Sequence, residues 1–410
     1  MSKTCPLLAR QPIFDRDMQV VAYELLYRTS EDNHAVITDG NSASSQVLLN
    51  AFTELSLNKV VGNNRAYINF TGDLMDTTFP FDTSQLVIEV LENETVNSRL
   101  LHRLKTLREA GFAIALDDFE LTPTTEPLLA YADIVKLDVL ALSDSQLTDH
   151  IKKTKALGIQ VLAEKIESMA MLEHCKSLGC DLFQGYFLER PSIIKGRRLS
   201  ESKQAVLQLL AKLNEPNVAF EDVEKIIERD PVLSYKLLRL VNSAAFGLPR
   251  TIESLRQALT LLGLKIIKNW IGLLAMAKLS DKPAELSAQA LSRAKFCELI
   301  AAQSRPEYEC DRFFTAGLLS MLDAFMDAPL EQVIGSIQLS DQLKAALLEH
   351  AGEEGKLLLT VIDYEHGNWS AIDWAYLKSR NLDPGSLTAL YIQTLSWVDD
   401  TQLSIQADNN

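Results

Sequence analysis

The first half of the chain alternates short apolar runs with longer stretches of helical period. Short, continuous apolar runs between turn residues are typical of buried strands, whereas apolar residues three and four positions apart indicate amphipathic helices. This pattern predicts strands at Leu7–Phe14, Val20–Tyr27, Ala66–Phe70, Leu86–Val90, Phe112–Asp117, Ile134–Asp138, Ile159–Glu164 and Leu182–Phe187. Helices are predicted between them, notably at Ser42–Leu57, Val96–Ala110 and Ser168–Leu178.

The lengths of the connections between these strands predict the topology of the sheet. The first two runs are joined only by Asp15, Arg16, Asp17 and their neighbours, too few residues for a crossover helix, so this pair should be antiparallel. Most later strands are separated by helices, which indicates parallel pairing. The fold class predicted is therefore α/β, a modified TIM-like (β/α)8 barrel. An open doubly wound sheet is the alternative, but it needs a glycine-rich phosphate turn after the first strand, and the sequence has none.

The second half of the chain has a helical period. The change falls within Ile193–Ser202, where Lys195–Arg198 is basic and contains a glycine, and it divides the chain into predicted domains 1–195 and 196–410. Asp230 is a predicted helix cap with Pro231 at the first helical position. Helices are predicted at Phe220–Arg229 and Val232–Ser243, and within Ile252–Leu279, Leu286–Gln303 and Asp311–Phe325. The fold class is completed by an all-α domain.

Composition narrows the classes of partner. The 410 residues are 47% hydrophobic and carry a formal net charge of −15, which argues against electrostatic binding of nucleic acid. The five cysteines are scattered, which favours a reducing, cytoplasmic environment over a disulfide framework. We find no uninterrupted apolar run of about 18 residues and no signal-peptide core, so no membrane partner is expected.

Two adjacent carboxylates follow the predicted strand that ends near Leu116. Asp117 and Asp118 would repel each other unless a cation joins them, and a divalent metal is the usual one. A solvated loop in which Asp118 caps a helix is the alternative interpretation.

The same pattern of a polar residue on or near a strand end recurs along the first half. The residues are Glu24, Asn69, Glu89, Asp117, Lys136, Glu164 and Gln184, and the last six are separated by 20, 28, 19, 28 and 20 residues. Each interval is about one βα unit, so these side chains should converge on one mouth of the barrel.

Such a site, rich in carboxylates with one lysine, indicates a particular chemistry. Unpaired buried acids are unfavourable, and Mg²⁺ or Mn²⁺ would neutralise them and attract a phosphate substrate. The pattern therefore predicts metal-assisted hydrolysis of a phosphoester. An enolase-type barrel also uses strand-end acids, Mg²⁺ and a lysine. Those enzymes carry a capping domain before the barrel, whereas here the first strand starts near Leu7.

At these residues the chain resembles the EAL domains, which hydrolyse cyclic di-GMP, over about residues 6–195. The family's motifs appear in order as Glu24-Leu25-Leu26-Tyr27-Arg28, Tyr67-Ile68-Asn69, Glu89-Val90-Leu91-Glu92, Asp117-Asp118-Phe119, Lys136-Leu137-Asp138, Ala163-Glu164-Lys165-Ile166-Glu167-Ser168 and Gln184-Gly185-Tyr186.

The resemblance implies a role for each residue. It implies that one Mg²⁺ or Mn²⁺ is held by Glu24, Asn69, Glu89 and Asp117, that Asp118 joins Asp117 in bridging to a second cation, and that Ca²⁺ inhibits. Lys136 would orient the attacking water and offset charge, with Glu164 and Gln184 positioning that water. Arg28 would clamp a phosphate oxygen and Gln11 would contact the nucleotide. The product implied is the linear dinucleotide pGpG.

Two departures from the family's pattern concern the surroundings of these acids. Family members continue after Asp-Asp-Phe with Gly-Thr-Gly-x-Ser-Ser, whereas Glu120–Thr125 contains no glycine and one rigid proline, Pro123. Lys165 stands where the family has glycine. Weak hydrolysis is therefore expected. A catalytically inactive sensor of cyclic di-GMP, or a protein-interaction scaffold, is the alternative.

The second half resembles an HDOD domain. The resemblance is carried by Asp230–Gly247, Ile252–Ala258 and Leu262-Gly263, and it extends to about residue 390. HDOD domains are similar to HD phosphohydrolases that lack the metal-binding dyad, and here Gly317–Met321 reads Gly-Leu-Leu-Ser-Met in place of Gly-Leu-Leu-His-Asp. The resemblance implies a bacterial signalling protein with a protein partner for this half, and it allows a homodimer. A purely structural helical half is the alternative.

Overall fold

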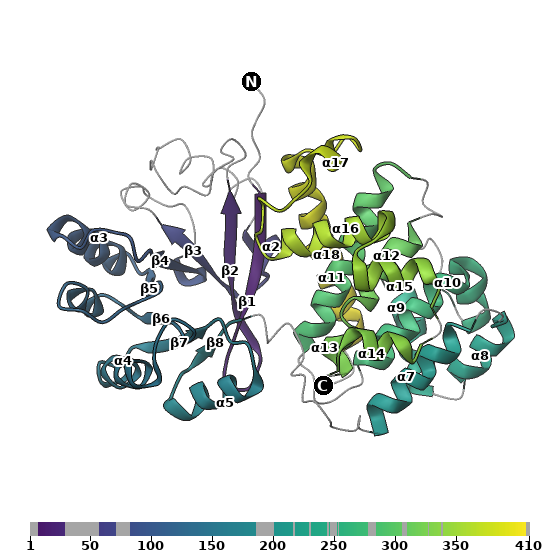
Figure 1. Ribbon diagram of the computed structural model, residues 1–410, viewed down its shortest axis with the longest axis horizontal. Helices are drawn as coiled ribbons and strands as arrows, with labels where there is room; N and C mark the ends of the chain where they lie inside the picture. The colour runs from purple at the N-terminus through teal and green to yellow at the C-terminus, as the bar shows by residue number, and fades with distance from the viewer. Residues whose placement is uncertain are drawn as a thin grey trace. The chain divides into compact units, whose positions relative to one another are not determined.

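The computed structural model describes residues 7–28, 57–70, 83–185, 201–215, 218–228, 231–243, 246, 252, 254–277, 284–305, 310–326, 328–337 and 339–406. Two compact units make up the chain, and we describe each by itself (Figure 1). One unit comprises residues 1–188 and 365–370, and the other comprises residues 189–364 and 371–410.

The first unit is built on a closed barrel of eight strands that are hydrogen-bonded in chain order (Figure 1). The strands are β1 (Leu7–Phe14), β2 (Val20–Arg28), β3 (Arg65–Phe70), β4 (Leu86–Val90), β5 (Ala113–Leu116), β6 (Ile134–Asp138), β7 (Gln160–Glu164) and β8 (Leu182–Phe183). β1 is antiparallel to both β2 and β8, and all other neighbours are parallel. The predicted fold class, a barrel with an antiparallel first hairpin followed by helices, is confirmed.

Helices connect the strands of the barrel. They are α2 (Leu57–Val61), α3 (Ser98–Glu109), α4 (Asp144–Ala156) and α5 (Met169–Leu178), with 3₁₀ turns η2 (Thr83–Gln85) and η3 (Glu126–Ala130). Polar caps define where the three longer helices begin: Asn97, Ser143 and Ser168 each accept a hydrogen bond from a backbone N–H of the first turn. Of the predicted helix 42–57, only Leu57 lies within the described residues, as do only the first four residues of the predicted last strand.

One apolar side chain from each strand packs inside the barrel. We call this ring the apolar layer; it consists of Ile13, Ala22, Tyr67, Val87, Ala115, Ile134, Leu162 and Leu182, each 8% exposed or less. Because side chains alternate between the two faces of a strand, the residue two positions along each strand also points inward. The apolar layer therefore determines which residue of each strand forms the next inward-facing ring of side chains.

The second unit is helical. Its helices are α7 (Glu201–Leu213), α8 (Phe220–Glu228), α9 (Pro231–Val241), α10 (Leu255–Ala277), α11 (Ala284–Ala302), α12 (Asp311–Leu319), α13 (Leu322–Met326), α14 (Leu330–Gly335), α15 (Asp341–Glu349), α16 (Gly352–Glu365), α17 (Trp374–Lys378) and α18 (Pro384–Gln406). Trp270 on α10 lies 5.7 Å from Trp397 on α18 and 6.1 Å from Phe314 on α12, between ring centroids. Aromatic contacts thus join helices that are far apart in the sequence.

The predicted helical range Asp311–Phe325 contains two helices, a division that the sequence pattern did not specify. α12 ends at Leu319 and α13 begins at Leu322. The Ser320 hydroxyl donates to the carbonyl of Gly317 at 2.7 Å, a local side-chain bond that competes with the helical ladder. α10 is also interrupted, at Gly263 with φ 79°. The predicted cap Asp230 lies outside the described residues.

One stretch of α10, Leu255–Met276, is long and apolar enough to cross a membrane by length and composition. Half of its most apolar window is buried within the structure, and core helices of globular proteins pass the same test. Among the described residues it is the single such helix, and it is weak evidence for a membrane span.

Candidate active site

A ring of polar side chains lies directly above the apolar layer. Seven polar residues each follow an apolar-layer residue by two positions, and Gln11 precedes Ile13 by two because β1 runs in the opposite direction. We call this ring the polar layer; it consists of Gln11, Glu24, Asn69, Glu89, Asp117, Lys136, Glu164 and Gln184. The barrel therefore brings together all the residues whose spacing suggested convergence, and adds Gln11.

Lys136 lies at the centre of the polar layer. Its Nζ is 2.6 Å from Glu89 Oε1, 2.7 Å from Asp117 Oδ1, 3.0 Å from Glu164 Oε1 and 3.6 Å from Glu24 Oε2. The Lys136 side chain is only 1% exposed, so these ion pairs are shielded from water. Four carboxylates face one ammonium, and the cluster keeps an excess of negative charge.

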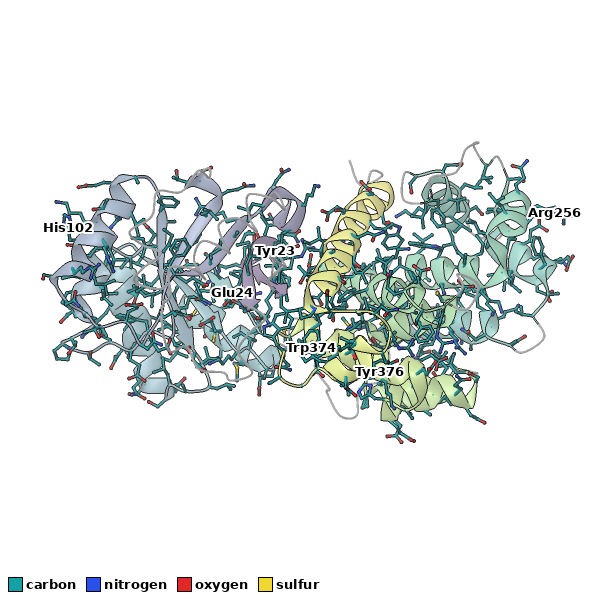
Figure 2. The ribbon with its side chains drawn as sticks, turned by 90° about the horizontal axis from the view of Figure 1, so that it is seen from above. Tyr23, Glu24, His102, Arg256, Trp374 and Tyr376 are labelled. Atoms are coloured by element: carbon teal, nitrogen blue, oxygen red, sulfur yellow. The ribbon has the colours of Figure 1, made fainter. Side chains whose placement is uncertain are left out.

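Amide side chains orient the carboxylate of Glu24, which stands next to Tyr23 on β2 (Figure 2). Gln184 Nε2 donates to Glu24 Oε2 at 2.8 Å and to Gln11 Oε1 at 3.2 Å. Gln184 Oε1 accepts no hydrogen bond from the described residues. The two glutamines therefore hold Glu24 in place and leave one buried acceptor facing the site.

Burial and mutual repulsion shift the pKa values of this cluster. Burial, with added repulsion from Glu24 and Asp117, raises the pKa of Glu89 well above its usual value. Burial likewise raises the pKa of Glu164 to about 8, against the opposing effect of Lys136. Burial alone would lower the pKa of Lys136, but the surrounding carboxylates raise it well above its usual value. The cluster thus favours an additional proton or cation.

The oxygen donors of the polar layer fit a hard divalent cation in kind. Glu89 is fully buried, and its Oε2 accepts no hydrogen bond from any described residue. Carboxylate and amide oxygens are the ligands that Mg²⁺ and Mn²⁺ prefer. Within the described ranges no three Asp, Glu, His or Cys side chains are placed to hold a metal ion, and the carboxylates of the polar layer surround the ammonium of Lys136.

A second cation–carboxylate cluster lies beside the polar layer. Lys165 Nζ pairs with Asp138 Oδ2 and lies 3.6 Å from Asp118 Oδ2. Asp138 Oδ1 accepts from the backbone N–H groups of Leu140 and Ala141 at 2.8 and 3.1 Å. Partial burial acts to raise the pKa of Asp138, but these hydrogen bonds lower it overall. No role was assigned to Asp138 from the sequence. Its position, two residues after Lys136, places its side chain on the same face of β6.

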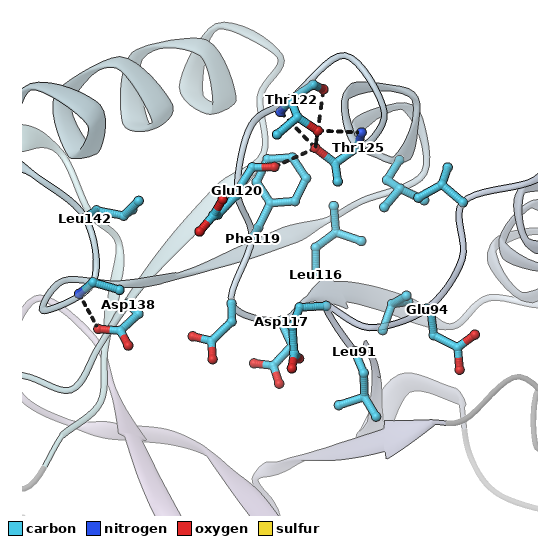
Figure 3. Close-up of a pocket in the computed structure, with 16 residues that line it drawn as sticks. Leu91, Glu94, Leu116, Asp117, Phe119, Glu120, Thr122, Thr125, Asp138 and Leu142 are labelled. Carbon is cyan, nitrogen blue, oxygen red and sulfur yellow. Dashed lines mark hydrogen bonds between the residues drawn. The ribbon is translucent and has the colours of Figure 1, made fainter. Parts of the chain in front are cut away.

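The segment after Asp118 is held by hydrogen bonds in place of glycines. Phe119 N–H donates to the carbonyl of Lys136 at 3.0 Å. Thr125 Oγ1 donates to the carbonyl of Glu120 at 2.5 Å and accepts from Thr122 N–H at 2.9 Å (Figure 3). Leu121 N–H donates to His150 Nε2 at 2.8 Å. The supporting loop is therefore anchored at both ends.

His150 anchors this loop only in one neutral form. Its Nε2 accepts from Leu121, so the ring proton lies on Nδ1, which donates to the carbonyl of Gln146 at 2.7 Å. The side chain is buried on α4, and nothing in the residue pattern distinguishes it from a core histidine. Sequence reasoning therefore missed it.

A cavity of about 430 Å³ opens beside Asp117, between the ends of β4, β5 and β6 (Figure 3). Its lining combines apolar and acidic side chains: Val90, Leu91, Glu92, Glu94, Val96, Leu116, Asp117, Asp118, Phe119, Glu120, Thr122, Thr125, Leu128, Asp138, Ala141 and Leu142. Arg28, a predicted phosphate ligand, ends β2, and its side chain lies outside the described part of the structure.

The helical unit has its own ion pairs, such as Arg312 Nε with the buried Glu354 at 2.9 Å, but no group of acidic, His or Cys side chains among its described residues that could hold a metal ion. Ser320 and Met321 are at most 9% exposed, and Arg293 Nη1 donates to Ser320 Oγ at 3.3 Å. Both residues are therefore buried, and Ser320 is held by local hydrogen bonds.

The raised pKa of Glu164 predicts a pH dependence of stability in protein treated with EDTA. The folded state binds a proton near pH 8, whereas an unfolded glutamate titrates near about 4.3, so unfolding releases protons between these values. The free energy of unfolding should therefore fall as pH rises from about 5 to about 8. Thermal unfolding of wild type and Glu164→Gln across this range provides the measurement. A slope that is equally steep in Glu164→Gln would contradict the assignment.

The His150 contact predicts that its loss loosens the loop. His150→Ala leaves the Leu121 N–H without its acceptor, which costs about 1–3 kcal/mol when the donor stays buried. Hydrogen–deuterium exchange should then accelerate in residues 119–126. His102→Ala, an exposed histidine on α3 (Figure 2), is the matched control and should leave exchange there unchanged. Unaltered exchange in His150→Ala would rule out its anchoring role.

Comparisons with known proteins agree with this architecture. The family model of the EAL domain matches residues 7–191, and that of the HDOD domain matches residues 199–332. A Bacillus subtilis protein, YuxH, is 36% identical over 402 residues, which cover 95% of this chain and 97% of that protein. A Vibrio cholerae protein named cyclic di-GMP phosphodiesterase CdgJ is 32% identical over 399 residues, or 96% and 92% of the two chains.

The solved structures that this chain is similar to include Klebsiella pneumoniae BlrP1 in a complex with manganese and cyclic di-GMP. It is 23% identical, with a TM-score of 0.38 over 45% of this chain and 56% of that one. The family assignment depends on the two domain models and on the two relatives that match nearly end to end. The chain belongs to the family of proteins that join an EAL domain to an HDOD domain.

Proposed function

We propose that this protein hydrolyses cyclic di-GMP to the linear dinucleotide at the polar layer, with Mg²⁺ or Mn²⁺. The observation that carries the proposal is the buried ring of four carboxylates around Lys136 at the mouth of the barrel. The Vibrio cholerae relative, named as a cyclic di-GMP phosphodiesterase, supports the choice of substrate.

In this proposal Glu24, Asn69, Glu89 and Asp117 hold the divalent cation. The full burial of Glu89 and the open acceptor on its Oε2 support that role. When bound, such a cation acts as a Lewis acid and lowers the pKa of a bound water.

The remaining residues of the polar layer handle protons and charge. Gln184 Oε1, which accepts no hydrogen bond from the described residues, can accept one from the attacking water. Glu164 can take the proton of that water when its carboxyl is ionised, a form that becomes common only as the pH approaches its pKa of about 8. Attack of water on phosphorus forms a new P–O bond and breaks the bond from phosphorus to the ribose 3′ oxygen, which leaves as a hydroxyl with a proton from solvent. Lys136 offsets the negative charge that develops on the phosphate oxygens. Gln11 orients Glu24 through Gln184, and Arg28 keeps its predicted role as a phosphate clamp.

The cavity beside Asp117 provides room for part of the dinucleotide. Its volume of about 430 Å³ lies within the usual range for small-molecule sites. Leu91 and Leu142 give it apolar walls, and the carboxylates of Glu92 and Glu94 can accept hydrogen bonds from the N–H groups of a guanine edge.

The second candidate is a cyclic di-GMP sensor without turnover. It is favoured by the departures at Glu120–Thr125, which lack the family's glycines. The hydrogen bonds within Glu120–Thr125 and the bond that Leu121 N–H donates to His150 support turnover instead, because they hold the backbone that follows Asp117 and Asp118. We propose slow hydrolysis.

The HDOD half is proposed to act as an interaction module. The buried, non-ligating Ser320 and Met321 support a role other than hydrolysis. A protein partner for this half, a homodimer, a cytoplasmic location and a domain boundary at residues 195 and 196 remain predictions.

The cation site predicts a loss of metal affinity in Asp117→Asn. The substitution removes a charged ligand next to Asp118, so Mn²⁺ affinity should fall by about tenfold or more, equivalent to about 1.4 kcal/mol. Isothermal titration provides the measurement. Asp144→Asn, an exposed aspartate at the start of α4, is the control and should bind like wild type. Equal affinity in wild type and Asp117→Asn would exclude Asp117 as a ligand.

The proposed reaction predicts product formation by the purified full-length protein. Linear dinucleotide should appear with Mg²⁺ or Mn²⁺ and be suppressed by Ca²⁺, as chromatography would show. Glu24→Gln and Lys136→Met should each slow its formation by about 10²-fold or more. Lys155→Met, a lysine paired with Asp181 away from the polar layer, should react like wild type. Binding of cyclic di-GMP without product would support the sensor instead, and absence of binding would leave only the scaffold.

A further inference from the structure

Lys165 stands where the family has glycine, next to the acids that the resemblance links to a second metal ion. Its ammonium contacts Asp138 and lies 3.6 Å from Asp118, the residue expected to bridge towards that ion. We propose that the Lys165 ammonium replaces the second divalent cation, so that the protein holds a single Mg²⁺ or Mn²⁺. This inference depends on the proposed function for the presence of the first cation.

The two carboxylates are arranged around the ammonium from different strands. Asp138 at the end of β6 has its Oδ1 held by two backbone N–H groups, which directs Oδ2 to Lys165. Asp118 follows β5, and its Oδ2 faces the same ammonium. A second divalent cation bound by Asp118 would lie close to the positive charge of Lys165, which is unfavourable.

The backbone supports a specific role for both side chains. Asp118 has φ 40° and Lys165 has φ 58°, and both angles lie in the left-handed region that favours glycine. Glycine at position 165 would adopt this conformation without strain. Non-glycine residues in such conformations concentrate at functional sites, and here the two strained residues present opposite charges to each other.

An ammonium reproduces only part of what a second cation does. It neutralises the two carboxylates and offers hydrogen bonds to a phosphate oxygen, but it does not bind water as a Lewis acid. Water activation would then rest on one cation and on Glu164. Lys165 would act as a positioning residue, because it holds Asp118 and Asp138 and contacts no group of the polar layer in the described residues.

The test is the number of Mn²⁺ ions per chain, measured by equilibrium titration and electron paramagnetic resonance on the full-length protein. Wild type should bind one Mn²⁺ with the spectrum of an isolated ion. Lys165→Gly, which suits the backbone, and Lys165→Met, which keeps the side-chain stem, should each bind two with a spin-coupled spectrum. Lys155→Met removes a half-exposed lysine paired with Asp181 and should still bind one.

Two Mn²⁺ ions in wild type, or the same number in wild type and both Lys165 variants, would overturn the proposal. Product formation from cyclic di-GMP, followed in the same samples, separates this inference from the proposed function. A rise from one ion to two without any product would overturn the proposed hydrolysis and support the role of Lys165. Formation of product, with the same number of ions in wild type and in both Lys165 variants, would support the proposed hydrolysis and overturn the role of Lys165.

Discussion

The barrel unit depends on the burial of four carboxylates around the ammonium of Lys136. Placing several acids in a protein interior is unfavourable unless they are paired, and removing one partner of a buried ion pair costs about 3–5 kcal/mol. Here one lysine, 1% exposed, faces Glu24, Glu89, Asp117 and Glu164. The excess of negative charge raises the pKa values of Glu89 and Glu164, and it gives the site its affinity for a further positive charge.

The rest of the barrel serves to hold these charges in register. Closure of the eight strands stacks the polar layer directly on the apolar layer, so each polar side chain is positioned by a packed neighbour two residues away. Gln184 fixes Glu24, and the carbonyl of Lys136 receives the N–H of Phe119. The loop after Asp118 is then secured from outside by His150. The ion pairs of Lys136 at the centre and the hydrogen bonds around them thus hold the same set of acidic side chains in place.

The helical unit is held together by close packing of helices. Gly317 on α12 packs so closely on α11 that an added Cβ would lie 2.6 Å from Ala294 Cα. The hydroxyl of Ser320, three residues later, donates to the Gly317 carbonyl at 2.7 Å. Packing and the aromatic contacts around Trp270 stabilise this unit, and its buried acid Glu354 is paired with Arg312 at 2.9 Å.

The sequence by itself determined the strands, their order and the phase of the polar layer. Backbone geometry makes side chains alternate along a strand, so Glu89 and Lys136 are placed inward by their own neighbours, and the regular spacing from Asn69 to Gln184 indicates one mouth. Only the tertiary structure decided which groups touch. The central position of Lys136, the anchoring by His150 and the pairing of Lys165 with Asp138 join residues on different elements. Such contacts depend on how the barrel closes, and no local pattern encodes that. The break between α12 and α13 has a local accompaniment instead: the Ser320 hydroxyl donates to the carbonyl of Gly317, and the apolar helical pattern gave no sign of it.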